Sequence, residues 1–164
     1  MKQTKFIVQA AVIAAIYVSL TYVMSLLGLS SGAIQIRISE ALTILPFFTP
    51  AAIPGLVIGC FLANLLTGCA FWDIVFGTLA TLIGAVVTYW LRNKSEYLAP
   101  IPPILSNAVI VPFVLMYVYG VQDAYWFLVL TVGIGEIISC GVLGLVLLKA
   151  LKPQRNRLFG PDIK

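Results

Sequence analysis

The chain has 164 residues, of which 61% are hydrophobic and only 10% are charged, and its formal net charge is +4. Soluble domains have about 45–50% apolar and about 25% charged residues, and a globule of this size could not bury so much apolar side chain. The composition excludes a soluble enzyme, a disordered tail and a fibrous protein. It predicts an all-α fold and a polytopic membrane protein.

Six apolar stretches follow one another along the chain, and a membrane-spanning helix takes about 20 residues. The first three cover residues 6–27, 38–48 and 51–68, and the first ends at a cluster of Gly and Ser. The fourth covers 74–91, the fifth begins after Pro102-Pro103 and ends near Gly120, and the sixth covers 124–148. We therefore expect six transmembrane helices.

The basic residues orient this bundle. With a cytoplasmic N-terminus, nine of the ten Lys and Arg residues fall on the inner side, and Arg37 alone falls outside. Such a bias is typical of the positive-inside rule. We therefore expect both termini in the cytoplasm and a multi-pass protein of the cell membrane, with a six-helix domain over 1–152 and a basic cytoplasmic tail over 153–164. The net charge then indicates orientation and contact with anionic lipid, and no binding of nucleic acid.

Several kinds of chemistry are excluded by missing residues. The sequence has no histidine, which removes zinc-histidine sites and Ser-His or Cys-His dyads. Cys60, Cys69 and Cys140 have no CxxC spacing and are interpreted as small apolar fillers. No Gly-x-x-x-x-Gly-Lys-Ser/Thr loop is present, so this chain itself is not expected to hydrolyse ATP. We expect no enzymatic activity, no metal and no cofactor.

Glu136 is the clearest candidate for ligand binding. It lies well inside the sixth apolar stretch, between Gly135 and Ile137. An ionisable side chain within a membrane costs at least a few kcal/mol, so it normally faces a cavity or a partner. The alternative is a structural carboxylate that bonds to neighbouring helices.

Four further candidates lie at the outer ends of predicted segments. Asp73 either stabilises the start of a helix or binds a flat ligand beside Trp72, which is otherwise a residue of the membrane interface. Arg37 and Glu40, three residues apart, either form an ion pair or belong to a lid over an outward pocket.

Two asparagines are also candidates. Asn64 lies near the outer end of the third segment. Its amide either hydrogen-bonds a ligand, by donating to a ring carbonyl and accepting from an adjacent N–H, or hydrogen-bonds another helix. Asn107 lies nearer the inner end of the fifth segment, so it is a weaker candidate for ligand binding in an outer pocket.

Small residues indicate two helix-packing faces. Gly55 and Gly59 form a Gly-x-x-x-Gly motif, for which we expect a contact inside the bundle. The first segment contains two overlapping Ala-x-x-x-Ala spacings, formed by Ala10, Ala11, Ala14 and Ala15. Spacing alone does not identify the partner of this face.

Three stretches resemble the queuosine-precursor transporter (QueT) family. They are residues 36–55 (IRISEALTILPFFTPAAIPG), 63–68 (ANLLTG) and 72–77 (WDIVFG), and the resemblance covers about residues 2–149. It implies an S component, the substrate-binding subunit of an energy-coupling-factor (ECF) transporter. Such six-helix proteins work with a membrane coupling subunit and two cytoplasmic ATPases, capture substrate outside and topple to release it. The resemblance also implies that the four alanines face the coupling subunit.

The implied substrate is a 7-deazaguanine base. One carboxylate can accept the adjacent N–H and amino groups of such a ring, Asn64 can donate to its carbonyl, and Trp72 can stack on its face. If the ring carries a cationic aminomethyl group, a second carboxylate is needed to pair with it. Glu40, Asp73 and Glu136 are the candidates for these two carboxylates. We expect the site in the outer half of segments three, four and six, under residues 28–37.

Two alternatives stay open. In the first, the chain is an S component for another vitamin or purine-like substrate. In the second, it is a self-sufficient, proton-coupled exporter in which Glu136 carries the proton. Transport that survives loss of the coupling subunit would favour the second.

Overall fold

The computed structural model describes residues 2–28 and 37–160, and within these ranges every regular element is helical. The all-α prediction is thus confirmed. The α-helices are α1 (Lys2–Leu26), α2 (Ala52–Leu66), α3 (Phe71–Leu91), α4 (Ile101–Tyr117), α5 (Tyr125–Glu136), α6 (Gly144–Leu151) and α7 (Arg155–Leu158). A 3₁₀ helix, η1 (Ile38–Phe47), precedes α2, and a π-helical segment, η3 (Ile137–Leu143), joins α5 to α6. Short 3₁₀ turns cover Glu96–Leu98 and Lys152–Gln154.

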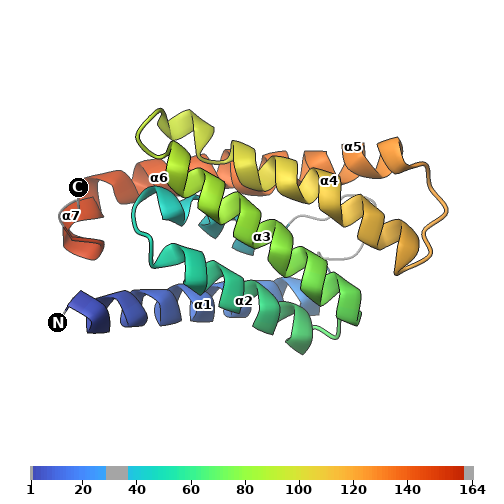
Figure 1. Cartoon of the computed structure of the whole chain (residues 1–164), viewed down its shortest axis with the longest axis horizontal. Helices are drawn as coiled ribbons and strands as arrows, with labels where there is room; N and C mark the ends of the chain where they lie inside the picture. Colours follow the sequence, from blue (N-terminus) through green and yellow to red (C-terminus); the bar gives the residue numbers. More distant parts are fainter. Residues whose placement is uncertain (1, 29–36, 161–164) are drawn as a thin grey trace.

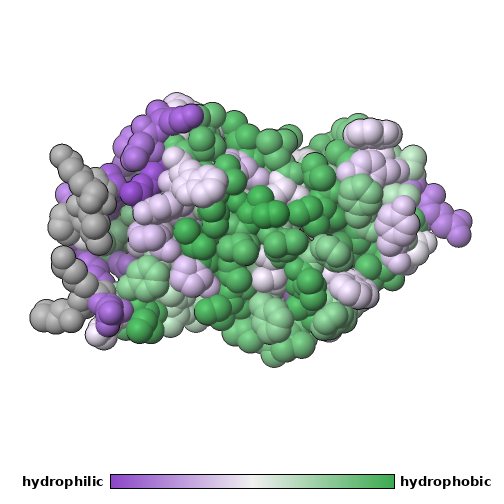
Figure 2. Space-filling model, viewed as in Figure 1, coloured by the Kyte–Doolittle hydropathy of each residue, from purple (hydrophilic) through white to green (hydrophobic). Residues whose placement is uncertain are grey.

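Four helical stretches are long and apolar enough to cross a membrane: Gln3–Leu26, Phe71–Leu91, Glu96–Tyr117 and Tyr125–Leu158. Figure 2 shows apolar side chains over the middle of the molecule and hydrophilic ones towards its ends. Both observations agree with the predicted multi-pass helical membrane protein. The apolar helices η1 and α2 are shorter, reaching only about 20 Å each against a hydrocarbon core of about 30 Å. The count of six membrane helices stays a prediction.

The η1 helix lies in the interior of the bundle. Its residues from Ser39 to Pro46 are all buried, and it packs against α1, α3, α6 and η3. Pro46 lacks a backbone N–H and so cannot contribute a full set of α-helical bonds. The segment thereby brings polar side chains, among them Glu40, into the centre of an otherwise apolar bundle.

Small residues allow α1 and α2 to pack closely. A Cβ atom on Gly55 would lie 2.7 Å from the carbonyl oxygen of Ala10, and one on Gly59 would lie 3.1 Å from the Cα atom of Ala14. The internal contact predicted for both glycines is confirmed. The same contact corrects the role given to Ala10 and Ala14, which are buried against α2, whereas Ala11 and Ala15 are exposed. Successive helical residues point about 100° apart, so the four alanines divide between two faces.

Replacing Gly55 by Ala should destabilise the protein by about 1–3 kcal/mol, because the added methyl group would press on backbone that cannot move aside cheaply. The midpoint of thermal unfolding in detergent micelles measures the effect. Gly133→Ala is the matched control, since a Cβ atom there would meet only the Ala108 Cβ atom, at 4.0 Å. Equal midpoints for the two variants would contradict close α1–α2 packing.

Both termini and the α3–α4 connection lie at the same end of the molecule (Figure 1). Lys152 and Glu96 form an ion pair there, and the ring of Phe159 stacks on Phe48 with centroids 5.2 Å apart. The Gln9 amide donates a hydrogen bond of 3.0 Å to the Leu158 carbonyl oxygen. The first part of the basic C-terminal segment is thus held against the bundle.

Candidate ligand-binding site

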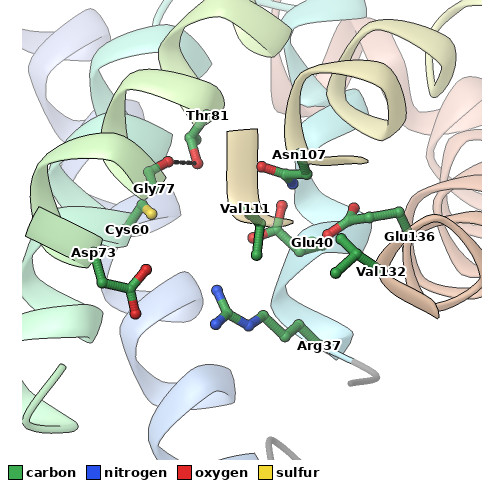
Figure 3. Close-up of a pocket in the computed structure, with 10 residues that line it drawn as sticks. All are labelled: Arg37, Glu40, Cys60, Asp73, Gly77, Thr81, Asn107, Val111, Val132 and Glu136. Atoms are coloured by element: carbon green, nitrogen blue, oxygen red, sulfur yellow. Dashed lines mark hydrogen bonds between the residues drawn. The ribbon is translucent and has the colours of Figure 1, made fainter. Parts of the chain in front are cut away.

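Two adjoining cavities lie between the helices. The inner cavity has a volume of about 20 Å³ and is lined by Arg37, Glu40, Cys60, Asp73, Gly77, Thr81, Asn107, Val111, Val132 and Glu136 (Figure 3). The outer cavity has a volume of about 400 Å³ and is lined by Thr21, Ser25, Arg37, Asn64, Thr67, Cys69, Asp73, Val111, Leu115, Tyr119 and Val121. Arg37, Asp73 and Val111 line both cavities. The structure therefore brings together six of the seven predicted substrate-binding residues.

Glu40 lies in the inner cavity and is almost fully buried, with 2% of its surface exposed. One carboxylate oxygen, Oε1, accepts a hydrogen bond from the Tyr17 hydroxyl of α1. The other oxygen, Oε2, is buried and has no hydrogen-bond partner in the part of the chain that the structure describes. A buried acceptor without a partner is costly, so this atom favours a ligand that can donate to it.

Glu136 lies beside Glu40, at the point where α5 changes into the π-helical segment. It is also buried, and its Oε2 atom accepts a hydrogen bond of 3.1 Å from the Cys140 thiol. One oxygen of each glutamate and the Cys140 sulfur all lie within 4.8 Å of one another. Two ionised carboxylates this close repel strongly at low dielectric. The arrangement therefore favours a cation or a donor-rich group.

Arg37 does not pair with Glu40, so the predicted ion pair is wrong. Residues 2–28 and 37–160 contain one ion pair, between Lys152 and Glu96. Arg37 has extended backbone before η1 begins, with φ −107° and ψ 99°, so the two residues do not share a helical face as the spacing predicted. Its backbone N–H donates to the Ser139 hydroxyl at 3.2 Å, and its guanidinium group points toward Asp73 (Figure 3). Most of the predicted lid, residues 29–36, lies outside the described residues.

Asp73 lies in the first turn of α3 and lines both cavities. Its Oδ2 atom accepts a hydrogen bond of 2.7 Å from the Tyr119 hydroxyl, whose oxygen accepts one of 3.1 Å from the Ala70 N–H. Partial burial raises the pKa of Tyr119 to about 12, so the phenol stays protonated at neutral pH and donates to the carboxylate. Asp73 makes no side-chain cap, because Ala70 is the N-cap residue of this helix.

The two asparagines occupy different cavities. Asn64 is buried on α2 and lines the outer cavity, with its Nδ2 atom 3.6 Å from the Cys60 sulfur. Asn107 is buried on α4 and lines the inner cavity with Glu136. Asn107 does not line the outer cavity, in keeping with its predicted place nearer the inner end of its segment, and its role in ligand binding stays a prediction.

Trp72 does not join these residues. Its side chain is 55% exposed and stacks on Phe76, with ring centroids 5.9 Å apart. It follows Phe71 and precedes Asp73 on α3, and adjacent residues point about 100° apart on a helix. When Asp73 faces the cavities, Trp72 therefore points away from them.

Three residues that hydrogen-bond the carboxylates of the site were not predicted. Tyr17 bonds Glu40, Tyr119 bonds Asp73, and Cys140, which was interpreted as a filler, bonds Glu136. Cys140 follows Glu136 by four residues, a spacing that places two side chains on one helical face. For Tyr17 and Tyr119 the sequence carries no comparable signal, because their partners lie 23 and 46 residues away.

The fold and the site together define a class: an all-α protein with several helices long and apolar enough to cross a membrane and with a buried cavity lined by acidic side chains. Comparison with protein families identifies it further. The family model described as QueT transporter matches residues 7–153, and the chain belongs to this family of transporters. The resemblance seen in the sequence is thus confirmed.

One curated relative is the queuosine precursor transporter QueT of Lactococcus lactis subsp. cremoris (strain MG1363). It is 40% identical to this chain over 101 residues. The alignment covers 59% of this chain and 59% of that protein. No solved structure matches the chain.

Proposed function

We propose that this chain is the substrate-binding (S) subunit of an ECF transporter and imports a queuosine precursor, a 7-deazaguanine base. Membership of the QueT transporter family and the name of the Lactococcus relative support the substrate class. One observation carries the proposal: two buried carboxylates, one of them with an unpartnered oxygen, line a small cavity that shares three lining residues with a cavity of about 400 Å³. Cavities of this size bind small molecules, and carboxylates suit a ring that is rich in N–H donors.

The proposed topology has six membrane helices, counting η1 and α2, with both termini in the cytoplasm. Residues 1–152 then form the transmembrane domain and 153–164 a basic cytoplasmic segment. The positive-inside bias supports this orientation, as does the position of both termini and the α3–α4 connection at one end (Figure 1). The outer cavity then faces the outside of the cell membrane.

The proposed contacts divide between the two cavities. In the outer cavity, the Asp73 carboxylate accepts the adjacent N–H and amino groups of the ring, and the Asn64 amide donates to its carbonyl oxygen. Arg37 lies at the boundary, and Glu40, Asn107 and Glu136 lie in the inner cavity. Trp72 is not part of the proposed set, because its ring lies outside both linings.

The proposed partners are a membrane coupling subunit and two cytoplasmic ATPases. The chain has no phosphate-binding loop of the P-loop type, so the proposal assigns ATP hydrolysis to the partner subunits. Ala11 and Ala15 are exposed on α1 and leave room for close approach of another helix. They are the proposed contact with the coupling subunit.

Titration calorimetry of the purified chain with 7-deazaguanine tests the proposal. We expect saturable binding, and Asp73→Asn should weaken it at least about tenfold, since a hydrogen bond to a charged group contributes about 1.5–3 kcal/mol. Asp123→Asn is the matched control, because Asp123 is exposed and lines neither cavity. A parent protein that does not bind 7-deazaguanine would overturn the proposed substrate class.

A further inference from the structure

We infer that Tyr119 is a positioning residue of the ligand site. Its hydroxyl group accepts the Ala70 N–H, which Asp73 would otherwise cap, and so holds the Asp73 carboxylate towards the cavities. The inference deepens the proposed function and rests on it for the role of Asp73, which is to accept the adjacent N–H and amino groups of the ring.

The place of Asp73 on α3 favours a different contact from the one observed. Ala70 is the N-cap residue of α3, so Asp73 is the third residue of the helix. A Glu or Gln side chain at this position reaches back to the N–H of the N-cap residue, and an Asp carboxylate offers the same kind of acceptor. Here the Ala70 N–H donates to the Tyr119 hydroxyl instead, at 3.1 Å. Tyr119 thus takes over the cap and leaves the carboxylate to the site.

The direction of the Tyr119 proton follows from this contact. A hydroxyl group has one proton and two lone pairs. Because the Ala70 N–H occupies a lone pair, the proton points at Asp73, whose Oδ2 atom accepts it at 2.7 Å. The hydroxyl group therefore fixes one oxygen of the carboxylate relative to the start of α3.

The other oxygen of Asp73 is then directed at the rest of the site. A Cβ atom on Gly77 would lie 3.8 Å from Asp73 Oδ1 and 3.1 Å from Asn64 Nδ2. Both atoms therefore lie over a residue that has no side chain. They are the acceptor and the donor that the proposed function assigns to the ring, and Figure 3 shows the carboxylate of Asp73 pointing into the space between the helices.

The backbone around Tyr119 holds the tyrosine in place. Tyr119 follows the end of α4, and its N–H donates to the Val114 carbonyl oxygen at 3.3 Å. The Val121 N–H donates to the Leu115 carbonyl oxygen at 3.0 Å. Gly120 lies between them with a φ of +67°, in the left-handed region that favours glycine. Backbone bonds thus close the turn on both sides of Tyr119, as a positioning residue requires.

Titration calorimetry of the full-length protein in detergent with 7-deazaguanine tests the inference. Tyr119→Phe should weaken binding at least about fivefold, because Asp73 loses a hydrogen bond and turns back to cap the Ala70 N–H. Tyr117→Phe is the matched control, since it removes the same hydroxyl group from a residue that is 80% exposed and lines neither cavity. Equal affinity of Tyr119→Phe and the parent protein would overturn the inference and leave the proposed function standing. If the parent protein does not bind, the proposed function fails and the inference fails with it.

A double-mutant cycle separates positioning from a general structural role. In protein that carries Asp73→Ala, adding Tyr119→Phe should change the affinity by less than about twofold, because no carboxylate remains to be positioned. Thermal unfolding midpoints confirm that each variant is folded. Single-variant factors that multiply in the double variant would show that Tyr119 supports the fold or contacts the ligand by itself, and would overturn the inference.

Discussion

Replacing Ala11 and Ala15 together by Trp should abolish uptake and leave ligand binding intact. Both side chains are exposed on α1 in the isolated chain, so two indole rings displace no internal contact. Helices in membranes approach closely through small residues, and bulk at these positions would keep the proposed coupling subunit away. Uptake of labelled precursor by cells that contain all partners, together with calorimetry of the purified variant, separates the two activities.

Two further variants sharpen this test. Leu130→Trp on α5 is the control for added bulk, since Leu130 is 63% exposed and lines neither cavity. Ala10→Trp with Ala14→Trp should instead unfold the protein, because these alanines are buried against Gly55 and Gly59. Unchanged uptake in the Ala11/Ala15 variant would refute the proposed contact. Uptake or export that persists without any coupling subunit would favour a self-sufficient, proton-coupled transporter.

Replacing Glu136 by Gln should weaken binding of a 7-deazaguanine base at least about thirtyfold. The substitution keeps the size of the side chain but removes its charge and turns one acceptor oxygen into a donor. In a site from which water is excluded, loss of one partner of a charged pair costs about 2–5 kcal/mol, and the low end of that range corresponds to the stated factor. Titration calorimetry measures the change.

The matched control is Asp123→Asn, which changes the same charge on an exposed residue between α4 and α5. We expect it to bind like the parent protein. Tight binding by Glu136→Gln together with weak binding by Asp123→Asn would contradict the assignment of the inner cavity.

The sequence by itself determines the class of this protein. Composition is a property of the whole chain, and 61% hydrophobic residues with 10% charge favour helices in a membrane, because in lipid the backbone groups of a segment must be satisfied internally. Local motifs were also sufficient for the family and for the close contact at Gly55 and Gly59. Both inferences depend on residues near one another in the chain.

The tertiary structure alone decided which side chains meet. Glu40 bonds Tyr17 rather than Arg37, and the Cys140 thiol lies 3.4 Å from the Glu40 carbonyl oxygen although 100 residues separate them. The direction of a side chain depends on the local type of helix, and Glu40 lies in a 3₁₀ segment, where α-helical spacing does not hold. Trp72 points away from the site for a related reason, since the orientation of α3 is set by its packing against α2 and α4. Membership of a site is thus a property of packing between distant segments, which local sequence patterns do not encode.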